Sequence, residues 1–354
     1  MYCLFLNASK LCAGMLRRGM KNFARLALLS PLISSGAMAA TTRYDLDEQV
    51  SFQAVTWLKD RVVASGTAGA IYLSQDDGQH WQKLNGPAQS DALQFRDNQW
   101  LDSGRLVVMS AGEEADSGIF ISDNLGQSWR RVATGETAST FYDCFYVASN
   151  GQGWLYGDAD EKGLFVLATE DSGEHWQRQQ VPFNAQPSEG GFASSGTCLN
   201  GAGDNGMVIG TGNGSVARVL LYTQGQWQSI ESPIAGGEAG GIFSLQPIKQ
   251  TLLVSGGSLK QSTLPAKAWL YDMADNSWLA LPALPLTGAV YGSAVLSVQG
   301  GVEYWVSNPQ GVAVLRPGAS DWQWVSQSNI WSLACQAGKG CIGVGKNGRI
   351  ELYQ

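Results

Sequence analysis

Histidine and charged residues are scarce in this chain of 354 residues. The only two histidines, His80 and His175, lie far apart in the sequence, which argues against a histidine-based zinc site. Charged residues make up 15% of the chain, and no apolar run is long enough to cross a membrane as a helix. Apolar residues at helical spacing are also missing after residue 40. We therefore expect an all-β fold with no metal, no cofactor and no membrane span.

Residues 1–39 differ from the rest of the chain. A basic stretch precedes a short apolar run, 26–33, and small residues follow at Ala37 and Ala39. This layout predicts a secretory signal peptide over residues 1–39, cleaved after Ala39 or Ala40, and a periplasmic or secreted mature protein over 41–354. The alternative is a buried N-terminal helix. The segment contains no acid and five basic residues: Lys10, Arg17, Arg18, Lys21 and Arg25.

Removal of that segment changes the net charge from −7 to −12. A surface so acidic repels nucleic acid, because binding to phosphates needs lysine and arginine. Four cysteines remain after cleavage. Cys335 and Cys341 flank a short glycine-rich turn and are a candidate disulfide. Cys144 and Cys198 lie in strand-like runs, where they form either a second disulfide or buried free thiols.

One short turn recurs along the chain. "LSQDDGQHW" (73–81) is repeated as "ISDNLGQSW" (121–129) and "ATEDSGEHW" (168–176). The Asp or Asn side chain accepts hydrogen bonds from the amides of its own turn, the glycine takes a left-handed conformation, and the tryptophan buries a large apolar face. We expect these turns to be structural and peripheral. Their defining residues are Ser74, Asp76, Gly78, Trp81, Ser122, Asn124, Gly126, Trp129, Thr169, Asp171, Gly173 and Trp176.

The turn belongs to a longer repeat of 46 to 51 residues. Each unit reads as about four short strands, which is the size of a β-propeller blade. The last unit, from residue 330, has only three strands, and the segment 41–50 supplies the missing outer one. The sequence thus predicts a seven-bladed β-propeller closed by its N-terminal strand. The turn-closing tryptophans are Trp81, Trp129, Trp176, Trp227, Trp278 and Trp324, and the aromatics that open the units are Phe52, Phe95, Phe141, Phe192, Phe243, Tyr291 and Trp331.

The turns resemble the Asp-box (BNR) repeats of sialidases, sortilin-type receptors and photosystem II stability/assembly-factor-like propellers. The chain is most similar to the bacterial secreted members of the last group. The similar stretches include "MSAGE" (109–113), "FYDCFYV" (141–147), "GFASSGTC" (191–198) and "VYGSAV" (290–295). This resemblance implies the propeller fold and assigns no activity. The arginine triad and the Arg-Ile-Pro motif that sialidases need are not found, which argues against sialidase activity.

Polar groups near the start of each unit are the candidates for a ligand site, because the first strands of a propeller line its channel. Carboxylates with an arginine and a tyrosine suit a sugar, although such groups also bond to loop backbone or to water. The candidate ligand-binding residues are Glu113, Asp143, Asp158, Glu189, Ser195, Thr197, Arg218, Glu238 and Tyr291.

Two functions follow from these residues. The first is a monomeric binding or assembly scaffold that takes an envelope protein or a glycan on the channel face bearing Glu113, Glu189, Arg218 and Glu238. The second is a carbohydrate-active enzyme, glycosidase-like but not a typical sialidase, that uses paired carboxylates in the channel mouth. The sequence assigns no catalytic residue to it, and the candidates are Glu238 and Tyr291.

Overall fold

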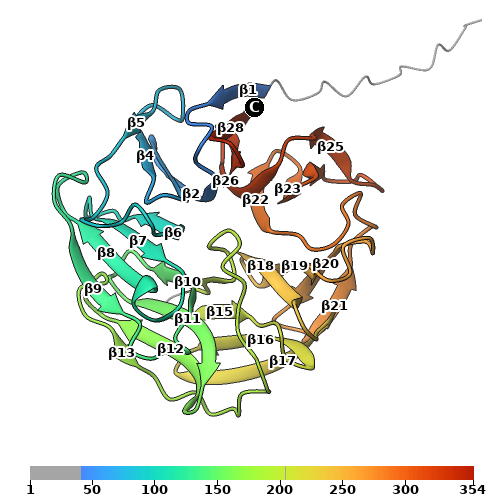
Figure 1. Cartoon of the computed structure of the whole chain (residues 1–354). Coiled ribbons are helices and arrows are strands. Elements are labelled where there is room, and N and C mark those ends of the chain that lie inside the picture. Colours follow the sequence, from blue (N-terminus) through green and yellow to red (C-terminus); the bar gives the residue numbers. More distant parts are fainter. Residues whose placement is uncertain (1–40, 204) are drawn as a thin grey trace, which may run out of the picture. The chain divides into compact units, whose positions relative to one another are not determined.

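The chain folds as a ring of seven antiparallel sheets around a central axis (Figure 1). This computed structural model describes residues 41–203 and 205–354, so the predicted signal peptide lies outside the described residues. Each sheet has four strands, and the one helix of the described residues is a single 3₁₀ turn, η1 (Glu114–Asp116). No helix among the described residues has the length and apolarity needed to cross a membrane. The predicted all-β, seven-bladed propeller is confirmed.

Blades 1 to 4 follow one another along the chain, each starting at the axis. Blade 1 contains β2 (Phe52–Leu58), β3 (Arg61–Gly66), β4 (Ile71–Ser74) and β5 (Gln82–Lys83). Blade 2 contains β6 (Phe95–Trp100), β7 (Leu106–Ser110), β8 (Gly118–Ser122) and β9 (Arg130–Thr134). Blade 3 contains β10 (Tyr142–Val147), β11 (Gly153–Asp160), β12 (Gly163–Thr169) and β13 (Gln177–Arg178). Blade 4 contains β14 (Leu199–Gly201), β15 (Met207–Gly210), β16 (Val216–Thr223) and β17 (Gln226–Ala235).

Blades 5 to 7 complete the ring. Blade 5 contains β18 (Gly240–Ile248), β19 (Thr251–Ser258), β20 (Lys267–Asp272) and β21 (Ser277–Ala280). Blade 6 contains β22 (Gly292–Val298), β23 (Gly301–Asn308), β24 (Gly311–Leu315) and β25 (Gln323–Ser326). Blade 7 contains β26 (Ile330–Gln336), β27 (Gly340–Gly345), β28 (Arg349–Tyr353) and the N-terminal strand β1 (Thr41–Asp45).

Blade 7 closes the ring by joining both ends of the propeller in one sheet. β1 pairs with β28 along its whole length, from Thr41 opposite Tyr353 to Asp45 opposite Arg349. Figure 1 shows the blue β1 beside the red β28. The segment 41–50 therefore supplies the fourth strand, as predicted, and β28 is left without a free edge.

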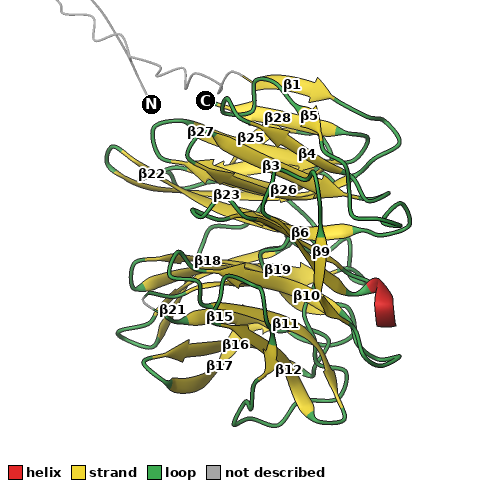
Figure 2. Cartoon of the chain, turned by 90° about the vertical axis from the view of Figure 1, so that its left-hand side faces the viewer, coloured by secondary structure: helices red, strands yellow, loops and turns green. Residues whose placement is uncertain are grey.

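The strands are buried from both sides because each blade packs face to face against its neighbours. All five residues of β7 and all five of β8 are buried, whereas both residues of the outermost strand β5 are exposed. Strands buried on both faces read as continuous apolar runs, which explains stretches such as "LVVMS". Seven hydrophobic clusters fill the seven spaces between blades, and in each the residues come from two successive blades. Figure 2 shows the sheets stacked edge-on.

The Asp-box hairpins connect the third and fourth strands of blades 1 to 3. In the first box the Ser74 hydroxyl accepts the Gly78 amide at 2.9 Å, and the Asp76 carboxylate accepts the His80 amide at 2.9 Å. The Trp81 indole donates to the Gly78 carbonyl at 2.9 Å. The third box repeats these bonds through Thr169, Asp171, Gly173, His175 and Trp176.

The middle box differs at its tryptophan. Ser122 and Asn124 bond to the amides of Gly126 and Ser128, as in the other two boxes. The Trp129 indole, however, donates at 2.8 Å to the carbonyl of Asn85, which lies after blade 1. This box therefore ties blade 2 to the preceding blade as well as closing its own hairpin.

Two details of the predicted repeat are wrong. In blade 6 the turn-closing tryptophan is Trp322, not Trp324, because Trp322 is 7% exposed, packs in the cluster between blades 5 and 6, and donates to the Pro282 carbonyl. Trp324 is 39% exposed in β25. In blade 4 the segment around Phe192 is not a strand, since β14 begins only at Leu199. The residues before it leave the sheet for the channel.

Candidate functional site

The two mouths of the channel have different loops. We call the side on which the first strand of each blade begins the upper face, and the side on which it ends the lower face. The Asp-box turns belong to the lower face, because the third strand of each blade runs in the same direction as the first. The predicted ligand-binding residues belong to the upper face or to the channel below it, and one of them, Thr197, also lines the pocket of the lower mouth.

Four of these residues form one buried cluster between blades 3 and 4. The Arg218 guanidinium donates two hydrogen bonds of 2.7 Å to the Glu189 carboxylate, whose side chain is fully buried. Asp143 is buried beside them, and Asp158 is half-buried. Burial raises the pKa of Asp143 well above its ordinary value and raises that of Asp158 to about 6. These groups are therefore engaged with the protein rather than open to a ligand.

The channel is crossed by residues 190–197, which we call the plug. It comes from blade 4, and three of its hydrogen bonds reach blades 2, 6 and 7. Arg96 of β6 donates to the Ala193 carbonyl at 3.1 Å, Ser195 donates to the Tyr291 carbonyl at 2.7 Å, and Ser332 of β26 donates to the Ser195 carbonyl at 3.1 Å. Figure 1 shows the chain just before β15 projecting into the middle of the ring. The plug therefore fills the part of the channel beside which most of the candidate ligand-binding residues lie.

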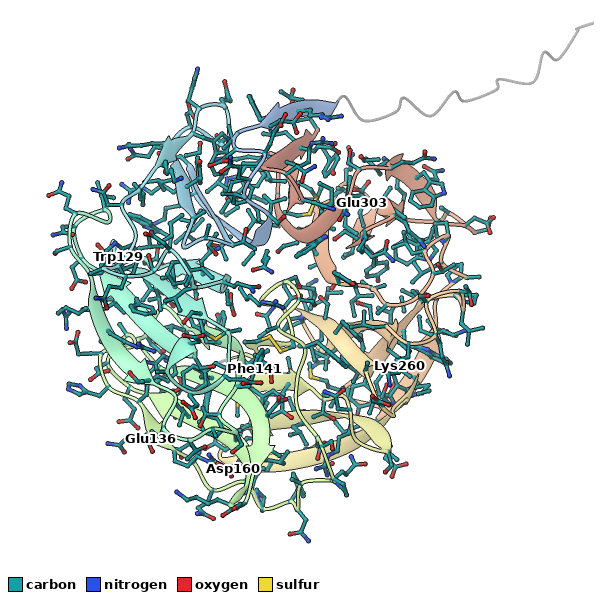
Figure 3. All side chains as sticks on the ribbon, in the orientation of Figure 1. Trp129, Glu136, Phe141, Asp160, Lys260 and Glu303 are labelled. Carbon is teal, nitrogen blue, oxygen red and sulfur yellow. A yellow bond between two sulfur atoms is a disulfide. The ribbon has the colours of Figure 1, made fainter. Side chains whose placement is uncertain are left out.

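The remaining candidates are separated from that cluster. Glu113 is exposed next to η1, and Glu238 is exposed and paired with Lys260. Tyr291 stacks against Phe243, with ring centroids 6.2 Å apart. Figure 3 shows Lys260 and Glu136 toward the outside of the ring and Phe141 nearer the axis. No contact joins Glu238 to Tyr291 within the described residues, so the proposed catalytic pair is not assembled.

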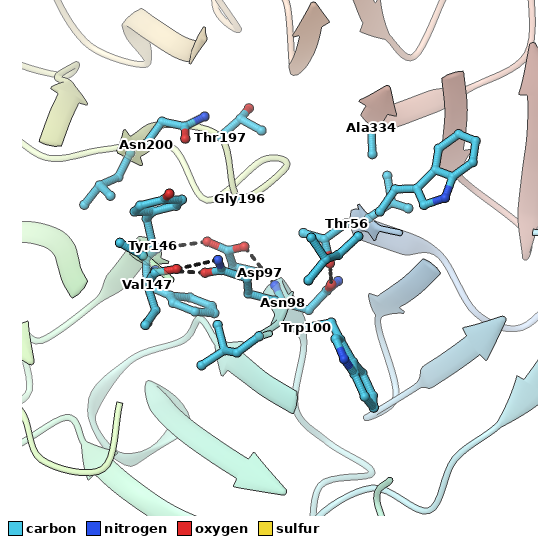
Figure 4. A pocket seen from close by; sticks show the side chains of 18 of the residues that line it. Thr56, Asp97, Asn98, Trp100, Tyr146, Val147, Gly196, Thr197, Asn200 and Ala334 are labelled. Atoms are coloured by element: carbon cyan, nitrogen blue, oxygen red, sulfur yellow. Dashed lines mark hydrogen bonds between the residues drawn. The ribbon is translucent and has the colours of Figure 1, made fainter. Parts of the chain in front are cut away.

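The lower mouth contains an open pocket of about 460 Å³ on the axis of the ring. First strands of all seven blades line it, and the plug residues Gly196 and Thr197 form part of its floor (Figure 4). The lining is aromatic and amide-rich. Its only carboxylates are Asp97, which is buried, and Asp102, which pairs with Lys59 at 2.8 Å. The aromatic and amide side chains are Trp57, Asn98, Gln99, Trp100, Phe145, Tyr146, Asn200 and Gln246.

Hydrogen bonds between neighbouring first strands hold this pocket in shape. Thr56 donates to Asn98 at 2.7 Å, and the Gln99 amide group both donates to and accepts from the backbone of Val147. The buried Asp97 carboxylate accepts the Phe145 amide at 2.8 Å. Burial raises the pKa of Asp97 well above its ordinary value, although the amides of Phe145 and Asn98 oppose the shift. The pocket wall is thus cross-linked by hydrogen bonds between neighbouring blades.

A disulfide continues this belt between blades 3 and 4. Cys144 of β10 is bonded to Cys198, the residue that follows the plug, which settles the alternative left open by the sequence. Cys335 and Cys341, the pair expected across the glycine-rich turn, also form a disulfide. The first bridge fixes the end of the plug to the neighbouring blade.

Sequence reasoning missed Arg96, Asp97, Tyr156 and the residues of the lower pocket other than Thr197. For the pocket, the available signal is the set of amide side chains within the first strands, such as Asn98, Asn200 and Gln246. The candidates chosen from the sequence lie in the glycine-rich segments near the start of each unit, and most of these segments are on the upper face. The residues described, 41–203 and 205–354, hold no group of three or more side chains suited to a metal ion.

Seven four-stranded blades and a ring closed by its N-terminal strand define a seven-bladed β-propeller. The chain is similar to YCF48 from Cyanidioschyzon merolae, with a TM-score of 0.65 and 10% identity over 89% of this chain and 99% of that one. It is also similar to the structure of YCF48 bound to D1 peptide, with a TM-score of 0.60 and 15% identity over 91% and 99% of the two chains. No protein-family model and no curated protein matches the sequence. The expected resemblance is confirmed at the level of the fold.

Proposed function

We propose that this propeller is a non-catalytic binding scaffold for a protein partner. An uncharged or apolar segment of that partner occupies the pocket of the lower face. The observation that carries this proposal is the pocket itself, which has about 460 Å³ of space and a wall to which all seven blades contribute, with aromatic and amide side chains from blades 1 to 5. Concave, mainly apolar sites with a few polar groups are typical of ligand binding. Amides pair well with peptide groups, and aromatic rings supply contact area.

Two further observations support a protein partner over catalysis. The carboxylates expected to act on a sugar are occupied, Glu189 by Arg218 and Glu238 by Lys260. One of the similar structures is YCF48 bound to D1 peptide, so a propeller of this fold binds a peptide. We also propose a periplasmic or secreted location, which the two disulfides support because such bonds persist in oxidising compartments.

Photo-crosslinking tests the proposed site. A benzophenone amino acid replaces Ser149, which is exposed at the rim of the pocket, or Ala138, which is exposed on the upper face. We expect a protein adduct from the Ser149 position only. The crosslinked segment, identified by mass spectrometry, is then made as a synthetic peptide.

The affinity of that peptide is measured for the unchanged protein and for two variants. Ala334→Arg fills the pocket and is expected to weaken binding by about tenfold or more, whereas the matched control Ala138→Arg leaves it unchanged. Adducts from Ala138 alone, or equal affinities for all three proteins, would contradict the proposal. Displacement of the peptide by a soluble glycan would favour the glycan alternative.

A further inference from the structure

The first part of the plug is packed directly against two carboxyl groups. The Gly191 amide donates to the Asp143 carboxyl at 2.8 Å. A Cβ atom on Gly190 would lie 1.6 Å from the Asp158 carboxyl oxygen, and one on Gly191 would lie 2.8 Å from the Asp143 carboxyl group. Only glycine at these positions lets the backbone close over the acids.

Charged and titratable groups from several elements lie around this pair, and a further buried acid, Asp97 of β6, packs against Gly196 at the other end of the plug. Arg96 of β6 lies on one side, and Glu189 and Arg218 form their own ion pair on the other. Tyr156 of β11 is fully buried, and its hydroxyl has no hydrogen-bond partner among the described residues. With one proton on the two aspartates, their single negative charge balances Arg96, and Glu189 balances Arg218.

Ionisation of both aspartates breaks this balance. A second negative charge then lies in a buried site where Arg96 is the one cation that no carboxylate pairs with among the described residues, and each carboxylate repels the other. Water relieves this repulsion, and it also provides the missing partner for the Tyr156 hydroxyl. Both changes require the plug to move away from the acids.

We propose that the plug is a proton-controlled gate: loss of the proton that Asp143 and Asp158 hold between them releases residues 190–196 and connects the lower pocket with the upper face. The proton leaves to solvent, and no bond other than hydrogen bonds changes. The disulfide at Cys198 keeps the far end of the plug in place. This gate would regulate the depth of the proposed binding pocket, but its opening does not depend on any partner.

The direction of the effect follows from linkage. Burial raises the pKa of both acids in the closed state, so the closed state binds more protons than the open one. Raising the pH therefore favours opening, by up to about tenfold per pH unit for one proton. For Asp158 this window extends from the ordinary pKa of 3.8 to about 6.

Hydrogen–deuterium exchange of the mature protein without any ligand tests the gate. Protection factors, which remove the pH dependence of intrinsic exchange, are compared from about pH 5 to about pH 8. We expect protection of residues 191–196 to fall as the pH rises. Asp158→Asn, which has nearly the same shape but cannot ionise, should weaken this dependence, and the matched control Glu161→Gln, an exposed acid of the same blade, should retain it.

Protection that is constant with pH, or that falls equally in Asp158→Asn, would overturn the proposal. Circular dichroism verifies the fold of each variant, and Asp143→Asn replaces Asp158→Asn if the latter does not fold. Failure of the gate leaves the lower pocket and its crosslinks unaffected. If the protection of the plug depends on pH but no partner is crosslinked, the gate proposal stands and the proposed scaffold function is contradicted.

Discussion

At the scale of single residues, the Asp boxes combine a backbone role with an unusual acid–base pair. The Asp76 carboxylate accepts the His80 amide and also contacts the His80 ring, Oδ2 to Nδ1, at 2.6 Å. Asp171 and His175 repeat this arrangement, with a ring contact of 2.7 Å. Both pairs lie on the surface, so solvent screens them and their contribution to stability is small.

These contacts predict two strongly acidic aspartates. The hydrogen bond from the His80 ring lowers the pKa of Asp76 to about 2. A lowered pKa stabilises the folded state above the ordinary value of 3.8, and this contribution is lost as the pH falls through about 2. We expect His80→Ala to return the pKa of Asp76 toward 3.8 in a carboxyl-detected NMR titration. Asp171 is the internal control, since its own partner His175 is unchanged; a shift of both acids would contradict this account.

At the scale of elements, the two disulfides close very different lengths of chain. Cys144–Cys198 spans 54 residues and joins blades 3 and 4, whereas Cys335–Cys341 spans 6 residues within blade 7. Loop-closure entropy grows with loop length, so removal of the longer bridge should cost about 4 kcal/mol and removal of the shorter about 2 kcal/mol.

Paired alanine substitutions test this difference. Chemical denaturation measures the unfolding free energy of each double variant. Both values should be lower than that of the unchanged protein, and the loss should be larger for Cys144→Ala/Cys198→Ala than for Cys335→Ala/Cys341→Ala. Each double variant is the control for the other. Equal losses would show that chain entropy does not govern the two bridges.

The turns between the third and fourth strands could be predicted from the sequence, whereas Trp322 and the plug could not. Each box encodes its own hairpin through contacts within eight residues, such as Ser74 to Gly78, so these turns are recognisable locally. Trp322 was missed because a second tryptophan follows two positions later, and only packing distinguishes them. The plug was missed because its partners, Arg96 and Ser332, are distant in the sequence and carry no local pattern.

At the scale of the whole molecule, stability depends on the closed ring. Blade 7 gains its outer strand from the N-terminal segment, and β1 pairs with β28 at five positions. The apolar repeat and the three-strand last unit made this closure predictable. The location of the pocket was not predictable, because it depends on which mouth the plug leaves open.

Deletion of residues 41–45 tests the importance of closure. Loss of the β1 hydrogen bonds, each worth about 1 kcal/mol net, should lower the melting temperature by about 5–10 °C. The exposed edge of β28 should also promote association, measured by light scattering. The control is a chain that begins at residue 41. Equal melting temperatures for the two chains would mean that the other three strands of blade 7 close the ring by themselves.

The plug has a consequence for the shape of anything that fills the lower pocket. Gly196 and Thr197 make the pocket a blind end while the plug is in place. An occupant must go in and come out through the same opening. It therefore presents the tip of a hairpin or the terminus of a chain, and the middle of an extended polypeptide cannot be threaded through the ring.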